Sequence, residues 1–323
     1  MHSIFFAIMT YLGIFGWASN SMATDMGAKQ AGPADVETAI SLKYLAQFGR
    51  EGTGDGQFVG PFGVHVSLNG YVYVADDLNH VIQVFDRGGR FVKRIGRFGK
   101  GPGEFAYVDS VITDKSGHIY VADTGNNRVQ VLDSAGKSIR EIKHWGLTRQ
   151  GFQNPRDLSF DSRGRLFVAD WGNHSIEVFG TDLWFLHKIG KKGHGDGEFL
   201  NPIQLLHDAS DRVYVSDFNN HRIQVFDTGG KYLFSFGEGG ERPGHFRNPA
   251  GLAFDSRGRL FVADRNNHRI QVFTSQGRFV AVFGELGHSE GEFENPEGLD
   301  IDCDNRLYAV DKGNHRVQVF KIH

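Results

Sequence analysis

Aspartate recurs six times along this 323-residue chain at a constant interval of 47 residues. The six are Asp76, Asp123, Asp170, Asp217, Asp264 and Asp311. Each aspartate follows a short apolar run and precedes a polar turn and a second apolar run. A fixed period of this length indicates one supersecondary unit copied along the chain, which limits the fold to a repeat architecture.

The fifth copy shows the plan of the unit. Its apolar runs occupy residues 251–254, 260–263, 270–273 and 279–283, and Gly, Asn, Asp, Arg and Ser fill most of the gaps. Apolar runs between turn-forming residues predict β-strands. Four short strands in a repeat of roughly 45 residues are typical of a β-propeller blade. The predicted fold class is therefore all-β, a six-bladed β-propeller of four-stranded antiparallel blades.

The two ends of the repeat region predict how the ring closes. The last copy stops at its third strand, residues 317–320, whereas residues 44–49 resemble a fourth strand with no other three before it. We therefore expect the N-terminal strand (residues 41–49) to complete the last blade, which leaves no open edge in the ring. The predicted propeller domain spans residues 41–323.

The first 40 residues precede the repeats. Residues 4–17 are apolar, and Ser21, Met22 and Ala23 resemble a small-x-small cleavage site. The apolar run is shorter than the roughly 20 residues of a spanning helix. This pattern predicts a signal peptide at residues 1–23, a linker at 24–40, no stable membrane span, and a secreted or periplasmic location.

The repeat consensus V-A-D-x-x-N-H-R-I-Q-V-F resembles the NHL repeat. All six copies carry Asn three residues after the aspartate, and the resemblance covers essentially the whole chain after the linker. It implies a six-bladed propeller. The family includes RNA-binding modules of tripartite-motif proteins, bacterial sensor domains and peptidyl-hydroxyglycine amidating lyases, so it implies several alternative functions.

The lyase alternative can be tested on five short motifs. The amidating lyases look like Pro-His-[Gly/Ser/Asp] at three blade starts, where the histidines bind catalytic zinc. The matching triplets here contain no histidine. They are Pro61-Phe62-Gly63, Pro155-Arg156-Asp157, Pro202-Ile203-Gln204, Pro249-Ala250-Gly251 and Pro296-Glu297-Gly298. We therefore predict no catalytic residue and no metal ligand by this resemblance.

The repeated polar residues have a structural interpretation. Strands lie about 4.8 Å apart, so a turn between the second and third strands sits on the order of 10 Å from the ring axis. Histidines in such turns are too far apart to share a zinc ion, which needs ligands at about 2 Å. We expect the six aspartates to accept turn N–H groups, and the following His or Asn to tie the turn to the next blade. The arginine that follows one residue later in four copies is expected to pair with the aspartate.

Function is expected where the copies differ. The turn residues Trp171 and Phe218 are predicted to be exposed aromatics on adjacent blades, hence a contact patch or, equally, packing for neighbouring loops. The positions after each leading proline also differ strongly, and they should ring the mouth of the central channel. Two deeper neighbours, Asp157 and Gln204, are added to these positions. The polar or charged residues of the set are then Asp109, Arg156, Asp157, Gln204 and Glu297, and the apolar residues are Phe62, Ile203 and Ala250.

This ring admits two interpretations. It could bind a polar ligand or a Ca²⁺ ion, which takes oxygen ligands. Alternatively, the arginine and the carboxylates neutralise one another over a water-filled channel. The formal net charge of −3 opposes nucleic-acid binding, which usually shows a basic excess.

The sequence thus favours an exported, monomeric, non-catalytic binding module. It would recognise a protein, peptide or glycan through the loop-rich face. The predicted contacts are Trp171, Phe218, Phe62, Asp109, Arg156, Asp157, Gln204 and Glu297. The alternatives are a propeller enzyme, either a lyase or a lactonase-like hydrolase with a channel metal ion, and an RNA-binding NHL domain.

Overall fold

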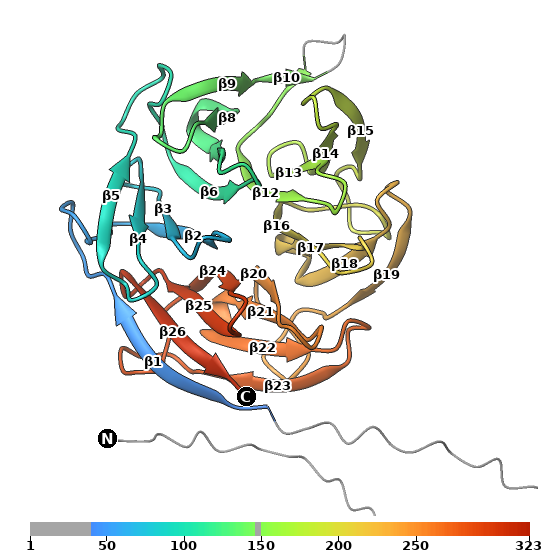
Figure 1. Ribbon diagram of the computed structural model, residues 1–323. Coiled ribbons are helices and arrows are strands. Elements are labelled where there is room, and N and C mark those ends of the chain that lie inside the picture. Colours follow the sequence, from blue (N-terminus) through green and yellow to red (C-terminus); the bar gives the residue numbers. More distant parts are fainter. Residues whose placement is uncertain (1–39, 146–149) are drawn as a thin grey trace, which may run out of the picture.

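The computed structural model describes residues 40–145 and 150–323, which form six four-stranded β-sheets arranged as a ring (Figure 1). Helix within these ranges is limited to three short 3₁₀ turns, at Thr124–Asn126, Phe218–Asn220 and Arg265–Asn267. None of the described helical segments has the length and apolar character needed to cross a membrane. The predicted signal peptide, and the predicted linker up to residue 39, lie outside the described residues.

Each blade is an antiparallel sheet whose first strand lies nearest the ring axis (Figure 1). The first blade contains β2 (Pro61–Val66), β3 (Val72–Asp76), β4 (Val81–Phe85) and β5 (Phe91–Ile95), and the second contains β6 (Val108–Thr113), β7 (Ile119–Asp123), β8 (Arg128–Leu132) and β9 (Ser138–Ile142). The third blade contains β12 (Pro155–Phe160), β13 (Leu166–Asp170), β14 (Ser175–Phe179) and β15 (Phe185–Ile189), and the fourth contains β16 (Pro202–His207), β17 (Val213–Asp217), β18 (Arg222–Phe226) and β19 (Tyr232–Phe236). The fifth blade contains β20 (Pro249–Phe254), β21 (Leu260–Asp264), β22 (Arg269–Phe273) and β23 (Phe279–Phe283). A short extra pair, β10 (His144–Trp145) and β11 (Gln150–Gly151), lies between the second and third blades.

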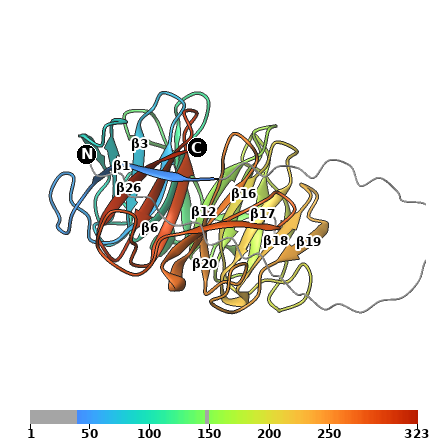
Figure 2. The ribbon, with the colours of Figure 1, turned by 90° about the horizontal axis from the view of Figure 1, so that it is seen from below.

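The sixth blade joins the two ends of the chain, as the sequence predicted. It contains β24 (Pro296–Ile301), β25 (Arg306–Asp311), β26 (Arg316–Ile322) and, outermost, β1 (Leu42–Phe48). β1 pairs antiparallel with β26 from Leu42 opposite Ile322 to Phe48 opposite Val317. Figures 1 and 2 show β1 lying along β26 at the rim of the ring. This pairing closes the ring without an exposed ring edge.

The core lies between neighbouring blades. Residues of the second and third strands are buried on both faces, so each sheet packs against the sheet before it and the sheet after it. One phenylalanine leads into each blade, and all six are buried (Phe58, Phe105, Phe152, Phe199, Phe246 and Phe293). Burying a side chain of this size stabilises the fold by roughly 1.5–3 kcal/mol.

The glycine that ends a fourth strand makes room for this phenylalanine. At Gly96 the backbone has φ +85°, and an added Cβ would lie 2.2 Å from the ring of Phe105. Only glycine satisfies both the left-handed backbone and the close approach of the ring. The same arrangement recurs at other blade ends, such as Gly190 with Phe199.

Candidate functional site

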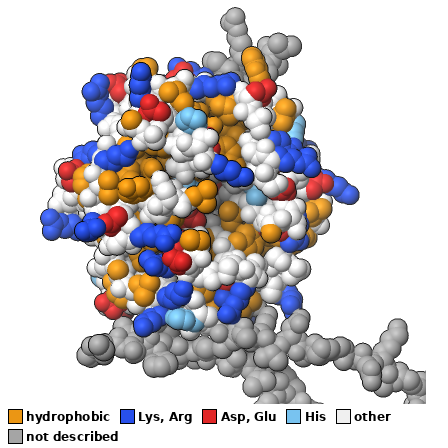
Figure 3. Space-filling model, viewed as in Figure 1, with side chains coloured by type: hydrophobic (Ala, Val, Ile, Leu, Met, Phe, Trp, Pro, Cys, Tyr) orange, Lys and Arg blue, Asp and Glu red, His pale blue; other side chains and the backbone are white. Residues whose placement is uncertain are grey.

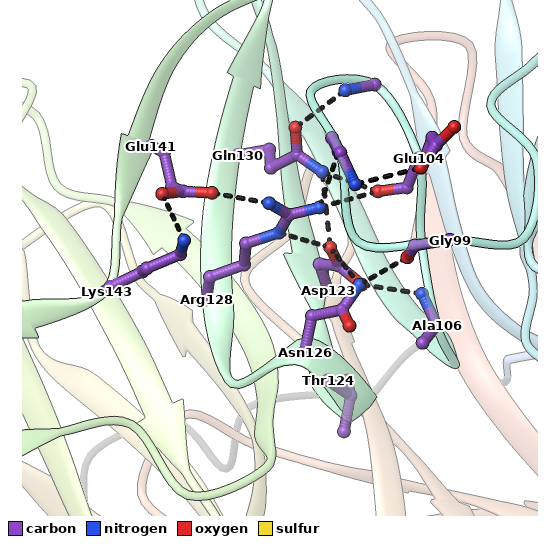
Figure 4. A network of polar contacts seen from close by, with 12 residues as sticks. Gly99, Glu104, Ala106, Asp123, Thr124, Asn126, Arg128, Gln130, Glu141 and Lys143 are labelled. Carbon is purple, nitrogen blue, oxygen red and sulfur yellow. Dashed lines mark hydrogen bonds and ion pairs between the residues drawn. The ribbon is translucent and has the colours of Figure 1, made fainter.

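The repeated aspartates lie at the mouth-side ends of the second strands, where five of the six accept hydrogen bonds from three parts of their blade (Figure 4). Asp170 accepts only from the leading loop and the turn among the described residues. Asp123 is fully buried and accepts hydrogen bonds from the N–H of Ala106 (2.8 Å) and from the Nδ2 of Asn126 (3.0 Å). It also accepts from Arg128 Nε (2.6 Å) and Gln130 Nε2 (3.2 Å). This carboxylate therefore joins the leading loop, the turn and the third strand of its own blade.

The same arrangement recurs in the other blades that have the arginine. The Arg Nε to Asp Oδ2 distances are 2.9 Å for Arg222 and Asp217, 2.7 Å for Arg269 and Asp264, and 2.7 Å for Arg316 and Asp311. The first blade has Val81 in place of the arginine and the third has Ser175. All of these donors belong to the chain itself, so the six aspartates hold the blades and leave little capacity for a ligand.

In five of the six blades the residue that ends this turn links one blade to the next, whereas His315 Nδ1 of the sixth blade has no hydrogen-bond partner among the described residues. In four blades a histidine Nδ1 accepts the N–H of a residue in the following leading loop, as His174 does from Asn201 at 3.0 Å. Asn127 does the same in the second blade, accepting from Asn154 N at 2.7 Å. These contacts give the histidine a role between blades and leave it far from the ring axis.

The inner ends of the six first strands converge around the axis. At each inner end lies the residue that follows the leading proline, or the residue at the same repeat position. These six residues line one small cavity together with the deeper Asp157 and Gln204. Its volume is about 10 Å³, which is close to the minimum for one water molecule. The six residues are Phe62, Asp109, Arg156, Ile203, Ala250 and Glu297.

A second set of six residues surrounds this cavity, namely the first residue of each turn after the repeated aspartate. These are Asp77, Thr124, Trp171, Phe218, Arg265 and Lys312. Both sets together are called the channel mouth below. Of the second set only Trp171 and Phe218 were predicted as contacts. The other four occupy the same place in the repeat, so the 47-residue spacing could have identified them.

Opposite charges pair across the channel mouth. Arg156 Nη1 lies 2.7 Å from Asp109 Oδ2, and Arg265 Nε lies 2.5 Å from Glu297 Oε1. Lys312 Nζ lies 4.0 Å from the same Glu297 oxygen. Three cations and three carboxylates therefore share this small region. This geometry matches the self-neutralised cluster better than a free ring of carboxylates.

The aromatic residues differ from their predicted exposure. Phe218 is buried and Trp171 is half-buried, with their ring centroids 5.3 Å apart. They pack in one apolar cluster with Phe62, Ile203 and Ala250. Phe218 is therefore not exposed, and both rings fit the packing alternative, because first-strand residues of the first, fourth and fifth blades reach the same turn tips.

A cation lies over each of the three aromatic rings of this cluster, including Phe218, whose centroid is 5.9 Å from the Arg265 guanidinium. The Arg156 guanidinium lies 4.9 Å from the centroid of Trp171 and 5.5 Å from that of Phe62. Lys312 Nζ lies 4.4 Å from the centroid of Phe62. Such cation–π contacts are attractive, by about 0.5–2 kcal/mol each. The channel mouth thus has an apolar half and a charged half that meet at Phe62.

Three carboxyl groups of the channel mouth are incompletely satisfied. Burial raises the pKa of Asp109 to about 7 and that of Asp77 to about 6, against the opposing effect of the nearby Arg156 and Lys312 charges. Asp77 Oδ1, Asp109 Oδ1 and Glu297 Oε2 are buried and accept no hydrogen bond among the described residues. A buried acceptor without a donor is unfavourable by about 1–3 kcal/mol.

Asp157 and Gln204 are engaged between blades. Asp157 accepts hydrogen bonds from Ser110 Oγ (2.6 Å) and from the N–H of Leu205 (3.0 Å), and burial raises its pKa to about 6. Gln204 Oε1 accepts from the N–H of Leu252 at 2.6 Å. Both were predicted as contacts, and the structure places both against the cavity, with their oxygens already used by neighbouring blades.

Charges of both signs are interspersed over the face of the molecule seen in Figure 3, without an extended basic field on that face. A strong phosphate-binding surface usually shows clustered Lys and Arg.

Comparisons with known proteins agree with this architecture. The family model described as the NHL repeat matches residues 152–179, 207–226, 246–273 and 293–320. A second family model, described as a 6-bladed beta-propeller, matches residues 64–157. The two models together reach from the first blade to the last.

Curated relatives match over short stretches of the chain. Protein lin-41 of Caenorhabditis elegans is 42% identical over 50 residues, which are 16% of this chain and 4% of that protein. Protein brain tumor of Drosophila melanogaster is 48% identical over 48 residues, or 15% of this chain and 5% of that protein. The chain thus spans only a small fraction of the length of these relatives.

Solved structures with low sequence identity share the fold. Virginiamycin B lyase from Staphylococcus aureus has a TM-score of 0.61 and 13% identity, covering 88% of this chain and 99% of that chain. An auxiliary nutrient binding protein from Bacteroides thetaiotaomicron has a TM-score of 0.64 and 17% identity, covering 87% and 73%. The repeats matched by the family model and the six closed blades together show that the chain carries NHL repeats and has the six-bladed β-propeller fold.

Proposed function

We propose that this propeller is an exported, non-catalytic module that binds a protein or peptide partner at the channel mouth. Export rests on the sequence pattern of residues 1–23. Binding at the channel mouth is supported by the contrast between the repeats: the framework residues recur in nearly every blade, whereas the twelve residues of the channel mouth differ from blade to blade. Residues that the common packing of the blades does not require can instead contact a partner.

The observation that carries this proposal is the combination of a filled centre and a partly exposed rim. A cavity of about 10 Å³ has no room for a small-molecule substrate, since ligand pockets usually measure about 300–1,000 Å³. The charged side chains that a catalytic mechanism would need are held by each other. The partly exposed rim of the channel mouth, which includes Asp77, Trp171 and Lys312, instead suits contact with a partner from outside.

A peptide selection tests this proposal. The purified protein would be used to select binders from a phage-displayed library of random dodecapeptides. Replacing Asp77 by Asn and Lys312 by Gln removes one charge of each sign from the channel mouth with little change in size. We expect selected peptides to lose about tenfold or more in affinity for this double variant, as truncated interface contacts typically do.

The matched control is the ion pair of Asp86 and Arg90, at 2.7 Å on the opposite face. Replacing Asp86 by Asn and Arg90 by Gln also removes one charge of each sign, and binding should stay unchanged. Failure to enrich any peptide, or equal affinity for the wild type and the channel-mouth variant, would refute the proposal. Affinity would be measured by biolayer interferometry with synthetic peptides.

Calcium binding at the channel stays a prediction from the sequence, and it has a separate test. Asp109 and Glu297 already face Arg156 and Arg265, so a divalent cation would meet fixed positive charges. We expect about 1 mM CaCl₂ to leave the melting temperature unchanged, because a ligand that binds the folded state would raise it. A rise that Asp109→Asn abolishes would instead establish a channel ion and favour the enzyme alternative.

A further inference from the structure

An open groove lies on the channel-mouth face where the fourth and fifth blades, neighbours in the ring, meet (Figure 1). Its volume is about 690 Å³, within the roughly 300–1,000 Å³ of ligand pockets. One side is formed by His221, which ends the turn between β17 and β18, and the other by the loop that leads from β19 into β20. The groove is separate from the cavity at the ring axis, and none of the twelve channel-mouth residues lines it.

The groove exists because one position of this leading loop has no side chain. In five blades, within the described residues, a residue of the leading loop forms an isolated bridge with the buried phenylalanine, as Gly239 does with Phe246. The residues at this position in the other four blades are Glu51, Phe98, Lys192 and Leu286. Between the first and second blades, the ring of Phe98 lies 4.8 Å from that of His80 and covers it. Gly239 leaves the equivalent ring of His221 uncovered.

The same loop exchanges small and acidic residues for basic ones. Arg242 lies at the position that is occupied in four other blades by Gly54, Gly101, Gly195 and Ser289. In those four loops the N–H of this residue donates to a side chain three residues later. The accepting residues are Gln57, Glu104, Glu198 and Glu292. In the fifth blade His245 takes this place, so the loop has gained a guanidinium and lost a side-chain acceptor.

A second arginine lies on the same side of the groove. Arg247 occupies the position at which the other blades have Val59, Ala106, Gln153, Leu200 and Glu294. Its Nη1 lies 2.9 Å from Glu241 Oε1, and both side chains are more than half exposed. The guanidinium of the exposed Arg242 has no ion-pair or hydrogen-bond partner among the described residues. Two arginines thus face one glutamate, so the groove has a positive excess in a chain whose formal net charge is −3.

His221 adds a flat surface and a further donor. Its Nδ1 accepts the N–H of Asn248 at 3.1 Å, so the neutral ring carries its proton on Nε2. A Cβ added at Gly239 would lie 3.4 Å from Cδ2 of this ring, so the space at Gly239 borders the ring. With Arg242 and Arg247, the groove has more side-chain donors than acceptors. A ligand that matches it supplies acceptor oxygens and negative charge.

We propose that this groove binds a small organic anion. Its carboxylate or phosphate group is held by Arg242 and Arg247, because guanidinium groups match the geometry of both oxyanions. Its planar body covers the ring of His221, since a groove of this size accommodates more than the oxyanion itself. This site is distinct from the channel mouth and does not depend on the partner proposed there.

Titration calorimetry with two aromatic probes tests this proposal. Phenyl phosphate and benzoate each combine an oxyanion with a planar ring, whereas inorganic phosphate has no ring. We expect at least one aromatic probe to bind with one-to-one stoichiometry and a Kd below about 1 mM, more tightly than inorganic phosphate. The tighter of the two aromatic probes identifies the oxyanion that the groove prefers.

Two substitutions place the probe in the groove. Arg242→Gln removes one guanidinium at an exposed position and should weaken binding about tenfold or more, because hydrogen bonds between charged groups are strong. Gly239→Leu introduces the residue of the sixth blade over the His221 ring and should weaken binding by a similar factor. The φ of Gly239 lies outside the left-handed region, so leucine suits this backbone. The melting temperatures of both variants should equal that of the wild type.

Two controls accompany these variants. Arg278→Gln removes an exposed guanidinium from the turn between β22 and β23, on the opposite face, and should leave probe affinity unchanged. The double variant with Asp77→Asn and Lys312→Gln alters the channel mouth and should also bind the probe as the wild type does. This second control separates failure of the groove from failure of the proposed function.

Three outcomes would overturn the proposal. Absence of saturation by both aromatic probes up to about 10 mM would exclude the ligand class. Inorganic phosphate that binds as tightly as both aromatic probes would show that a bare anion suffices. Probe affinity that is retained in Arg242→Gln or Gly239→Leu, or that falls equally in Arg278→Gln, would place binding outside the groove.

Discussion

Replacing Asp264 by alanine is expected to lower the free energy of unfolding by about 3–5 kcal/mol, the usual result of removing one partner of a buried ion pair. The carboxylate is fully buried and accepts four hydrogen bonds. The donors are Arg247 N (2.7 Å), Asn267 Nδ2 (2.8 Å), Arg269 Nε (2.7 Å) and Gln271 Nε2 (3.0 Å). Alanine would leave all four without an acceptor and the Arg269 charge uncompensated.

This loss is large against the total stability of a domain, which is commonly about 5–15 kcal/mol. It should appear in urea unfolding followed by tryptophan fluorescence. Asp264→Asn separates charge from shape, because it keeps the volume but turns an amide N–H₂ toward existing donors. We expect it to lose nearly as much as alanine. Recovery to within about 1 kcal/mol of wild type would show that the charge contributes little.

Asp227, in the turn between β18 and β19 of the preceding blade, provides the matched control. It accepts the N–H groups of Gly229 and Lys231, both at 2.9 Å, at the surface. Asp227→Ala should lose only about 1 kcal/mol, because water replaces the lost acceptor. Equal losses at Asp227 and Asp264 would contradict the structural role assigned to the repeated aspartates.

The fold could be predicted from the sequence because the same order of strands and turns recurs in each repeat. The interval between the aspartates gave the blade count, and the strand left over at each end gave the closure by β1. The convergence of Asp109, Arg156 and Glu297 followed from one shared position in the repeat. Periodicity carries this information since equivalent residues occupy equivalent places around a closed ring.

Exposure and pairing at the channel mouth could not be predicted in the same way. Phe218 is buried because Ile203 and Ala250, from the first strands of two blades, reach its ring. The partner of Glu297 is Arg265, which comes from the turn of the preceding blade. Both facts depend on which side chains of different blades meet, and a repeat pattern contains no such information.

The exposed Tyr107 was not recognised from the sequence for a related reason. The sequence shows Tyr107 where other copies have asparagine, but the meaning of that asparagine lies in its positive φ. Without the backbone geometry, Tyr107 resembles one more variable loop residue. With the backbone geometry, Tyr107 is recognised as a residue with a strained backbone, at a position where four other repeats have asparagine.

The third blade replaces the usual polar network with a carboxyl pair. Ser175 and Glu177 stand where four of the other blades have arginine and all five others have glutamine, respectively. Glu177 is fully buried, accepts a hydrogen bond from Ser175 Oγ at 2.6 Å, and has an Oε2 without a donor among the described residues. Burial, and then the neighbouring Asp170 carboxyl, raise the pKa of Glu177 from 4.5 to about 7.

This raised pKa makes wild-type stability depend on pH. Because the folded state holds the proton more tightly than the unfolded state, the contribution of Glu177 is fully present below about pH 4.5. It is lost as the pH rises to about 7, where the folded group ionises. The shift corresponds to about 3 kcal/mol, since one pKa unit equals 1.36 kcal/mol.

Glu177→Gln should therefore stabilise the protein, by about 2–3 kcal/mol at pH 8. It restores the glutamine of the other blades, whose Nε2 donates to the aspartate, as in Gln224 and Asp217 at 3.0 Å. The gain should shrink toward pH 4.5, where wild-type Glu177 is protonated. Urea unfolding of both proteins between pH 4.5 and 8 measures this difference, in which the other titrating groups largely cancel.

Substitution of the exposed Glu290 is the control for Glu177→Gln. Glu290→Gln alters net charge by the same amount but should shift stability by less than about 0.5 kcal/mol at every pH, as surface substitutions usually do. A pH-independent gain for Glu177→Gln would mean that the glutamine acts through its hydrogen bond alone. No gain at pH 8 would show that Glu177 is already ionised and compensated there. Only a gain that grows between pH 4.5 and 7 fits a buried carboxyl pair that holds one proton.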